Sequence, residues 1–365
     1  MTILILANYA NGLFLFRKEL VESFMKAGHR VIVSVPFDEN VHKLRDMNVE
    51  LVDTHLERHG MNPLKDLKLF ASYIKIMKKT RPDAVLTYTI KPNIYGASAA
   101  KFLRIPYICN VTGLGTAIEG GGMLSKVLVK MYSFSMNRAK KVFFQNERNL
   151  EFMKKMGVAT KNAALLPGSG VNLTEHPFRE YPSEEGGIHF LAVIRIMRDK
   201  GIGEYLEAAE MIASEGRDVF FDLVGEYEED EREKYESKII DLEKRGIIKY
   251  HGHLDSVEPV MAQSHVIVHP SYHEGLSNVL LEAGACGRPV LATDVNGCKE
   301  TFEEGVTGIG FKPGDSKALA DAIRKILALS ENDRKEMGRT ARSFIEKNYD
   351  RKIVISTYEQ TLADL

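Results

Sequence analysis

The chain of 365 residues is 44% hydrophobic and 27% charged, values typical of a globular protein long enough for two domains. Its three cysteines, Cys109, Cys286 and Cys298, are far apart and follow neither a disulfide nor a metal-ligand spacing, so we expect a reducing cytoplasm. Polar and charged residues follow the apolar N-terminal stretch too soon for a signal peptide or a membrane span.

The net charge of −1 conceals an asymmetry between the two halves. Residues 1–170 contain 25 basic and 13 acidic residues, a net +12, whereas the remainder contains 24 basic and 37 acidic residues, a net −13. A basic half indicates an anionic partner, with a chance distribution of solvated charge as the alternative. We expect no nucleic acid among the partners.

The first half alternates short apolar stretches with helical patterns. Strands are expected at 3–7, 30–35, 50–53, 84–87, 107–111, 141–145 and 163–166. Helices are expected at 16–27, 41–47, 64–79, 95–103, 124–139 and 147–156. Such an alternation predicts a doubly wound parallel sheet with helices on both faces. Residues 1–170 are therefore predicted to form one Rossmann-like domain.

Residues 171–187 interrupt the alternation with two prolines in polar surroundings, and we predict a linker there. A second alternation follows. Its strands are expected at 189–193, 219–224, 248–251, 265–270 and 289–293, and its helices at 203–214, 231–244, 279–285 and 316–329. Residues 188–345 are predicted to form a second Rossmann-like domain. Residues 346–365 read as a charged helical tail, for which a return to the first domain is one option.

The most informative segment joins a buried strand to a helix in the second half. Glu274 lies on the turn between them, and Glu282 lies inside the helix. Gly275 lets the backbone approach a ligand, and Ser277 or Asn278 is expected to cap the helix, whose free N–H groups then point out of the turn. This arrangement suits phosphate, whereas the carboxylates suit hydroxyls. A ligand that carries both is a nucleotide sugar.

Two cations are expected on the loop that leaves the first strand of the second half. A diphosphate leaving group gathers negative charge in the transition state, and Arg195 and Lys200 would stabilise it there. Arg198 is a less certain third cation, and ordinary surface charge is the alternative reading. The chain contains no Asp-x-Asp pair, which metal-dependent sugar transferases use to hold a divalent ion. We therefore expect neutralisation by side chains and no metal.

Polar loops also follow the strands of the first half. Gly12 and Arg17 follow the first strand, Lys91 follows the fourth and Thr112 follows the fifth. Because the carboxyl ends of parallel strands meet at one edge of a sheet, we expect these residues to line a ligand cleft. Arg17 is a candidate for an acceptor phosphate, with an ordinary helix-surface cation as the alternative.

The segment from Val266 to Gly310 resembles the signature of GT-B retaining glycosyltransferases of family four, in which two glutamates are separated by seven residues. The resemblance extends over nearly the whole chain. It implies a GT-B architecture, an acceptor-binding first domain and a second domain that binds the nucleotide sugar in the cleft between them. It also implies a UDP-sugar donor, retaining transfer of a hexosyl or N-acetylhexosaminyl group, and no cofactor.

The resemblance also implies roles for individual residues. The catalytic set is Arg195, Lys200 and Glu274. Glu282 would bind the ribose, Glu274 the donor sugar, and the backbone amides from Ser277 to Val279 the distal phosphate. The other donor-binding positions are Gly12, Gly225, His273, Gly275, Leu276 and Asn278.

Two positions depart from the family pattern. Ile194 stands where the family has a glycine before the first catalytic arginine. The histidine that many members carry after the strand ending near Val111 is missing. Thr112, Lys91 and Glu119 are alternatives for its role, and the sequence does not choose among them.

A narrower resemblance, carried by Asn110 to Gly115 and Phe143 to Glu147, is to bacterial glycosyltransferases that extend polyprenyl-diphosphate-linked sugars. It implies a polyprenyl-diphosphate-linked sugar acceptor and a peripheral position on the inner face of the plasma membrane. The basic, apolar helices at 64–79 and 124–139 suit an anionic membrane surface, with ordinary core packing as the alternative. A UDP-sugar 2-epimerase and a non-catalytic sugar-nucleotide-binding subunit are the alternative functions.

Overall fold

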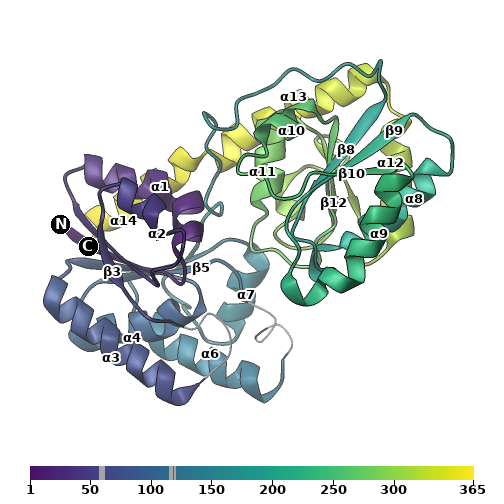
Figure 1. Ribbon diagram of the computed structural model, residues 1–365. Coiled ribbons are helices and arrows are strands. Elements are labelled where there is room, and N and C mark those ends of the chain that lie inside the picture. The colour runs from purple at the N-terminus through teal and green to yellow at the C-terminus, as the bar shows by residue number, and fades with distance from the viewer. Residues whose placement is uncertain (57–61, 115–117, 119–120) are drawn as a thin grey trace. The chain divides into compact units, whose positions relative to one another are not determined.

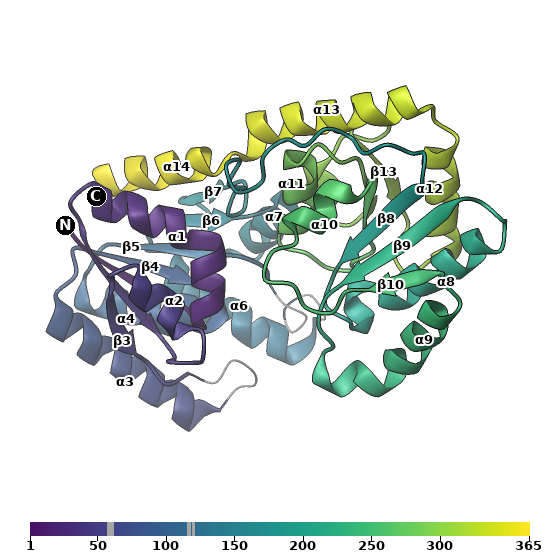
Figure 2. The ribbon, with the colours of Figure 1, turned by 45° about the horizontal axis from the view of Figure 1, so that its top comes forward.

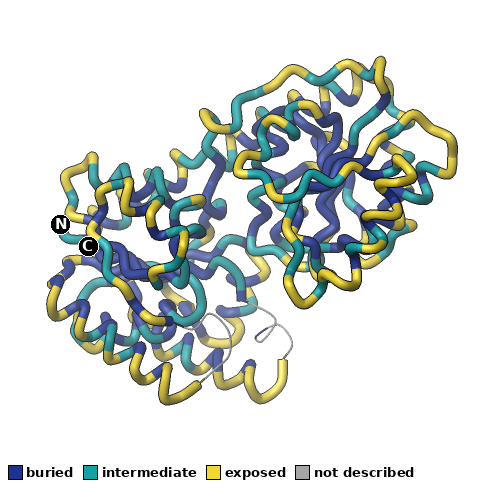
Figure 3. The backbone as a smooth tube through the Cα atoms, in the orientation of Figure 1, coloured by how far each residue is buried: buried dark blue, intermediate teal, exposed yellow. Residues whose placement is uncertain are grey.

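The computed structural model describes residues 1–365 except 57–61, 115–117 and 119–120. The chain divides into two compact units, each built around its own parallel sheet (Figure 1). The first unit contains Met1–Ser169 together with Lys352–Leu365, and the second contains Gly170–Arg351. The central strands of both sheets are buried (Figure 3), as expected for parallel sheets covered on both faces.

The sheet of the first unit has seven strands in the order β3-β2-β1-β4-β5-β6-β7, and every neighbouring pair is parallel. The strands are β1 (Thr2–Leu6), β2 (Arg30–Val35), β3 (Glu50–Asp53), β4 (Ala84–Tyr88), β5 (Tyr107–Val111), β6 (Lys141–Phe144) and β7 (Ala163–Leu165). All seven strands predicted in the first half are present. The order reverses between β1 and β4, because the chain builds outward from β1 on one side and from β4 on the other.

Helices cover both faces of this sheet, as the alternation predicted. One face carries α3 (Pro63–Thr80), α4 (Ala97–Leu103), α6 (Gly122–Met136) and α7 (Glu147–Lys155), with the short π-helical turn η1 (Pro92–Gly96) leading into α4. The opposite face carries α1 (Ala10–Lys26), α2 (Val41–Asp46) and the last helix, α14 (Arg351–Ala363).

The C-terminal helix α14 completes the first unit, so the option that the tail returns to the first domain is realised within this unit. Val354, Tyr358 and Leu362 share a core cluster with α1 and α2. In Figures 1 and 2 the yellow α14 runs beside the purple α1, and the two chain ends lie near each other. The core of the first unit is therefore assembled from both ends of the sequence.

The sheet of the second unit has six parallel strands in the order β10-β9-β8-β11-β12-β13. They are β8 (Ile188–Val193), β9 (Val219–Val224), β10 (Ile248–Tyr250), β11 (Val266–His269), β12 (Val290–Thr293) and β13 (Gly308–Phe311). The edge strand β13 is absent from the predicted elements. Glycine is depleted in strands, and two of the four residues of β13 are glycines.

Helices again lie on both faces of this sheet. One face carries α8 (Ile202–Ala213), α9 (Arg232–Lys244) and α12 (Ser316–Leu327). The other carries α10 (Glu258–Gln263), α11 (Asn278–Ala285) and α13 (Glu331–Tyr349). The three-residue helical turns η2 (Arg198–Lys200), η3 (Glu229–Glu231) and η4 (Lys299–Thr301) lie in the connections. Sequence patterning missed α10, whose six residues are too few to show a helical period.

Residues 171–187, predicted as a linker, instead pack as part of the second unit. The fully buried Arg288 donates from Nη1 and Nη2 to the carbonyl oxygens of Arg179 and Glu180, each at 3.0 Å. Glu184 forms an ion pair with Arg334 at 2.6 Å. A buried guanidinium needs several acceptors, and this extended segment supplies two of them.

No helix within the described parts of the chain combines the length and the apolar character needed to cross a bilayer. The apolar N-terminal stretch, predicted to form a strand at 3–7, forms β1.

Candidate functional site

The candidate site of the second unit lies where the strand order reverses. β8 and β11 are neighbours, and the strands that follow each of them build outward in opposite directions. Ligands of doubly wound sheets bind at the carboxyl ends of the strands at such a reversal. The loop after β8 carries Arg195 and Lys200, and the turn after β11 carries Glu274. The residues predicted to be catalytic therefore leave two adjacent strands at the same edge.

Lys200 and Glu274 form the centre of this site. Lys200 Nζ lies 2.5 Å from Glu274 Oε1, although the two residues are 74 positions apart in sequence. The same carboxylate oxygen lies 3.0 Å from His269 Nε2. Both partners of the ion pair are mostly buried, with side chains 19% and 16% exposed. The pair is therefore fixed in position before a ligand arrives.

The environment of Glu274 keeps its carboxylate ionised. Burial by itself would raise its pKa, but the hydrogen bond and charge of His269 and the charge of Lys200 outweigh that effect and lower the pKa to about 2. An ionised carboxylate can only accept hydrogen bonds. Glu274 is thus suited to accept sugar hydroxyls and not to donate a proton.

The N-terminus of α11 is shaped for an anion. Ser277 is the N-cap, and its Oγ accepts from the backbone N–H of Leu280 at 3.4 Å. Gly275 and Leu276 lie in the turn before it, and Asn278 and Val279 open the helix. The first amides of a helix have no intrahelical acceptor and carry the positive end of the helix dipole. The amides of Asn278 and Val279 therefore lie where phosphate binds best. The Ser277 N–H, also predicted to bind the distal phosphate, instead donates to the Gly297 carbonyl.

The turn before α11 is held by the chain near Gly297. The Ser277 N–H donates to the carbonyl of Gly297 at 2.8 Å. Gly297 has a φ of 85°, and a Cβ built there would lie 2.5 Å from the carbonyl oxygen of Glu274. A side chain at this position would push the Glu274 turn away. His273, predicted as a donor neighbour, lies in the same turn, and its carbonyl accepts from Ser271 Oγ at 3.2 Å.

Glu282 lies inside α11, as predicted, in an environment opposite to that of Glu274. Burial raises its pKa to about 7, with Arg351 offsetting part of this effect and Glu175 adding to it. A ribose presents two adjacent hydroxyl donors, and a carboxylate is a suitable acceptor for both. Burial therefore favours the protonated form of Glu282, and hydroxyl groups that donate to it would favour the ionised form.

Arg195 is placed differently from Lys200. Its Nη1 lies 2.8 Å from Glu228 Oε2 in an exposed ion pair. Exposed pairs contribute little free energy, so an incoming diphosphate could displace Glu228 at small cost. Gly225, predicted to lie near the donor, directly follows β9, and an added Cβ there would lie 1.8 Å from the carbonyl oxygen of Ile194. The close approach of these two segments requires a glycine.

In the first unit, Gly12 lies in the first turn of α1, whereas it was predicted in a loop before a helix at 16–27. The helix begins earlier than predicted, at Ala10, and the residue before it, Tyr9, is the N-cap in an extended conformation. A Cβ at Gly12 would overlap the ring of Tyr9, at 2.2 Å from its Cζ. The glycine therefore accommodates a tyrosine within the same unit.

Arg17 is buried, and neither reading from the sequence anticipated this. Its guanidinium carbon lies 5.1 Å from the centre of the Tyr88 ring, and its Nη1 donates to the Phe16 carbonyl at 2.7 Å. Tyr88 donates to the Tyr358 hydroxyl at 3.1 Å, and the Tyr358 hydroxyl donates to Asn110 Oδ1. Little of the guanidinium surface is left for an acceptor phosphate.

Lys91 and Thr112 lie after β4 and β5, at the edge where acceptor contacts were predicted. Lys91 Nζ forms an ion pair with Asp66 of α3 at 3.0 Å, and both side chains are largely buried. Thr112 is partly buried directly after β5. Glu119, the third alternative for the missing histidine, lies outside the described residues.

His269 and Glu228 are site residues that the sequence reading did not assign. His269 is the last residue of β11, so its place at a strand end beside the reversal of strand order was a usable signal. Glu228 lies 33 residues from Arg195, and no local pattern links the two. Within the described residues, no group of three or more His, Cys, Asp or Glu side chains is arranged to hold a metal ion.

Comparison with known proteins agrees with this geometry. Residues 174–344 match the family of glycosyl transferases group 1, and residues 2–146 match the glycosyl transferase 4-like family. One relative is the N,N'-diacetylbacillosaminyl-diphospho-undecaprenol alpha-1,3-N-acetylgalactosaminyltransferase of Campylobacter jejuni, 27% identical over 88% of each chain. The capsular polysaccharide biosynthesis glycosyltransferase CapM of Staphylococcus aureus is 27% identical over 79% of this chain and 78% of its own.

Solved structures show the same fold. Anabaena HepE in complex with UDP and glucose superposes with a TM-score of 0.83 over 100% of both chains at 20% identity. Sucrose-phosphate synthase from Thermosynechococcus elongatus gives 0.79 over 100% of both chains at 18% identity. The fold is GT-B, and the chain, with a group 1 domain in its second unit and a 4-like domain in its first, belongs to the family four glycosyltransferases.

Proposed function

We propose that this protein is a retaining glycosyltransferase that moves a hexosyl or N-acetylhexosaminyl group from a UDP-sugar to a sugar carried on polyprenyl diphosphate, in the assembly of a surface polysaccharide or glycan. The observation that carries the proposal is the buried Lys200–Glu274 pair beside the Ser277-capped start of α11. It puts a cation, an ionised carboxylate and the N-terminal end of a helix at one edge, matching the diphosphate and hydroxyls of a nucleotide sugar. The lipid-linked acceptor is supported by the Campylobacter jejuni relative.

The chemistry proposed for the site is a front-face displacement. Lys200 and Arg195 stabilise the charge that grows on the leaving diphosphate, while the amides of Asn278 and Val279 hold the distal phosphate. Glu274 accepts hydroxyls of the donor sugar, and Glu282 accepts those of the ribose. The leaving diphosphate takes the proton of the attacking acceptor hydroxyl, so the new glycosidic bond forms on the face that the diphosphate leaves.

The decisive experiment incubates the purified chain with a panel of UDP-sugars, with and without a polyprenyl-diphosphate-linked sugar, and measures UDP release and products. A transferase releases UDP and extends the acceptor only when both are present. An epimerase changes the UDP-sugar without acceptor, and a binding subunit leaves every substrate unchanged. Either of the last two results would overturn the proposal.

Substitutions of Glu274 and Glu282 should affect different kinetic quantities. Glu274→Gln removes the charge that accepts sugar hydroxyls, so it should chiefly lower kcat. Glu282→Gln should chiefly weaken UDP binding, by about tenfold for the loss of one charged acceptor. Calorimetry with UDP and steady-state kinetics separate the two effects. Unchanged UDP affinity in Glu282→Gln would contradict the ribose role.

We further propose that transfer requires no divalent metal, because Lys200 and Arg195 occupy the loop that would face the diphosphate. Activity should then survive EDTA treatment of the protein and substrates. Loss of activity in EDTA, restored by magnesium but not by a matched addition of sodium salt, would refute this part.

The outer surface formed by α3 and α6 supports a peripheral position on the inner face of the plasma membrane. Leu64 and Leu67 of α3 and Met123 and Phe134 of α6 are exposed, Met123 by 83%. Lysines accompany them on both helices: Lys65, Lys68, Lys75, Lys78, Lys126 and Lys130. Apolar side chains among lysines suit the interface of an anionic bilayer, where polyprenyl-linked acceptors reside.

A further inference from the structure

A buried histidine that the proposed chemistry does not use lies beside Glu274. His269 is the last residue of β11, and its side chain is 4% exposed. Its Nε2 lies 3.0 Å from Glu274 Oε1 and 3.1 Å from Ser277 Oγ. Its Nδ1 is buried and has no hydrogen-bond partner among the described residues. The ring therefore makes its polar contacts through Nε2, and both contacts are to residues of the candidate site.

These contacts decide which ring nitrogen of His269 carries a proton. A proton on Nδ1 alone would leave a buried N–H without an acceptor, and it would turn the lone pair of Nε2 toward the ionised carboxylate of Glu274. A proton on Nε2 makes that nitrogen a donor to Glu274 Oε1 instead. His269 therefore donates to Glu274 whether the ring is neutral or charged.

The two carboxylate oxygens of Glu274 are used unequally. Lys200 Nζ and His269 Nε2 both contact Oε1, at 2.5 and 3.0 Å. Within the described parts of the chain Oε2 has no hydrogen bond, and the Glu274 side chain is 16% exposed. An ionised carboxylate accepts through both oxygens. A carboxylate that is held through Oε1 can thus present Oε2 to a ligand.

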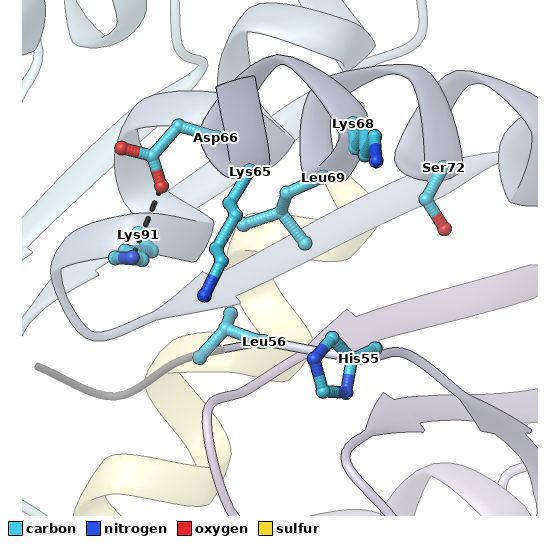
Figure 4. Close-up of a pocket in the computed structure, with 8 residues that line it drawn as sticks. All are labelled: His55, Leu56, Lys65, Asp66, Lys68, Leu69, Ser72 and Lys91. Carbon is cyan, nitrogen blue, oxygen red and sulfur yellow. Dashed lines mark hydrogen bonds and ion pairs between the residues drawn. The ribbon is translucent and has the colours of Figure 1, made fainter. Parts of the chain in front are cut away.

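A buried lysine–carboxylate pair of the first unit, shown in Figure 4, is arranged differently. Lys91 Nζ lies 3.0 Å from Asp66 Oδ1, and the Asp66 side chain is only 6% exposed. The Tyr95 hydroxyl also interacts with this carboxylate. Asp66 is thus occupied by its own neighbours, whereas Glu274 keeps an oxygen that a ligand can reach.

We propose that His269 is a positioning residue for sugar transfer, which holds Oε1 of Glu274 so that Oε2 accepts a hydroxyl of the donor sugar. Lys200 does not suffice for this, because its flexible ammonium also serves the diphosphate in the proposed chemistry. The imidazole is buried, and the sheet sets its place at the end of β11. The inference rests on the proposed function for the sugar, but the contact between His269 and Glu274 can be measured without a ligand.

Three substitutions of His269 separate the donor at Nε2 from the volume of the ring. His269→Leu removes the donor, His269→Asn places an amide too close to the backbone to reach Glu274, and His269→Gln places an amide N–H near the position of Nε2. We expect kcat to fall about tenfold in the first two variants, for the loss of one hydrogen bond to a charged group, and to recover in the third. UDP affinity should stay unchanged, because the Leu280 N–H still donates to Ser277 Oγ. Equal losses of kcat in all three variants would overturn the assignment.

The matched control is His265→Leu, which replaces the buried histidine directly before β11. The His265 ring accepts from the His189 N–H and contacts the Ser183 carbonyl, so this variant should lose stability but keep its kcat. In a Glu274→Gln background, His269→Leu should lower kcat no further, because the group that it positions is already altered. Losses that multiply in the double variant, or a fall in UDP affinity as large as the fall in kcat, would assign His269 to general packing and reject the proposal.

Nitrogen-15 NMR of the histidine rings tests the contact in the ligand-free, full-length protein. The His269 signal, assigned by its loss in His269→Gln, should show a proton on Nε2, and the signal of this proton should shift in Glu274→Gln. A proton on Nδ1 alone would overturn the proposal.

The outcomes separate this inference from the proposed function. Sugar transfer with an unchanged kcat in His269→Leu would keep the transferase and reject the positioning role. Absence of transfer from every UDP-sugar, together with an Nε2 proton that responds to Glu274→Gln, would reject the transferase and keep the positioning of the Glu274 carboxylate by His269.

Discussion

The strand order reverses between β1 and β4 in the first sheet and between β8 and β11 in the second. The residues near these two equivalent reversals differ in burial and in their partners. In the second unit the cation at this position, Lys200, pairs with Glu274 beside a helix start. In the first unit the cation, Arg17, is buried against Tyr88, and α14 closes the site with Tyr358. Equivalent topology therefore supports a charged binding edge in one unit and a packed core in the other.

The charge of the units differs in the same sense. The first unit, including its C-terminal segment, has 26 basic and 15 acidic residues, and the second has 23 basic and 35 acidic residues. In the acidic unit, Arg195 and Lys200 lie at the strand reversal, and both form ion pairs. The basic unit carries exposed lysines along α3 and α6. The proposed function accounts for this difference, because it requires a small ligand in the second unit and an extended anionic surface at the first.

The largest effect should come from breaking the charged edge of the second unit. Lys200→Ala should lower kcat by about a hundredfold, close to 3 kcal/mol of transition-state stabilisation, because a buried and preorganised cation is lost. Arg195→Ala should cost less, since its ion pair is exposed. Steady-state kinetics with Lys249→Ala as a surface control measure this. Near-normal turnover in Lys200→Ala would remove the assigned role.

A second effect should separate the two glutamates of the signature by pH. The pKa of Glu282 is raised from 4.5 to about 7, so the folded state holds its proton more tightly than the unfolded state. This contribution to stability is full below pH 4.5 and is lost as the pH rises through about 7, at most about 3 kcal/mol. Glu282→Gln should therefore be more stable than wild type at pH 8 and equally stable at pH 4. Thermal unfolding of both proteins at the two pH values tests this.

Glu274 should show the opposite dependence. Its pKa is lowered from 4.5 to about 2, so its contribution is present above pH 4.5 and lost as the pH falls through about 2. Glu274→Gln should consequently lose stability relative to wild type at pH 7, by an amount that shrinks in acid. A variant as stable as wild type at pH 7 would show that the Lys200 and His269 contacts do not favour the ionised form.

A smaller effect should follow from weakening the closed edge of the first unit. Tyr358→Phe removes the hydroxyl that donates to Asn110, leaving a buried amide oxygen without that donor at a cost of about 1–2 kcal/mol. Hydrogen exchange of β4 and β5 should accelerate, while exchange in β11 and UDP affinity stay unchanged. Parallel acceleration in both units would show that they do not unfold separately.

The smallest effect should concern the membrane surface. Lys126→Gln and Lys130→Gln should each weaken binding to anionic vesicles by about 1 kcal/mol and reduce its salt dependence. Lys26→Gln, on the opposite face of the first unit, is the matched control. UDP affinity should remain unchanged in all three variants. Equal sedimentation of the wild type with neutral and anionic vesicles would favour a soluble acceptor.

Sequence reasoning placed the residues of the candidate site in the second unit on the correct elements, because the signals for those elements are local. Ser277 as a cap, Glu274 on a turn and Glu282 in a helix all follow from a few consecutive residues with strong preferences. That the loop of Lys200 and the turn of Glu274 meet at one edge follows from a topological rule, but their ion pair was not predicted. The direction of the pKa shift of each glutamate could not be predicted, because it depends on neighbours such as His269 and Arg351.

The side-chain contacts of the first unit were harder to predict, because they join residues that are far apart in the sequence. The burial of Arg17 is set by Tyr88 and Tyr358, and Tyr358 lies at the far end of the chain. The partner of Lys91 is 25 residues earlier in the sequence, on a helix whose orientation depends on packing. Seven strands were predicted correctly from hydrophobic patterning, but patterning does not specify which polar side chains meet at their ends.

The return of α14 to the first unit has a consequence for synthesis on the ribosome. Because Val354, Tyr358 and Leu362 belong to the core of the first unit, that core cannot close until these residues leave the exit tunnel. The second unit is contiguous from Gly170 to Arg351 and can fold earlier. The nascent chain therefore carries an incomplete N-terminal unit, with its apolar surface uncovered, while the later unit matures, a reversal of the usual N-terminal-first order.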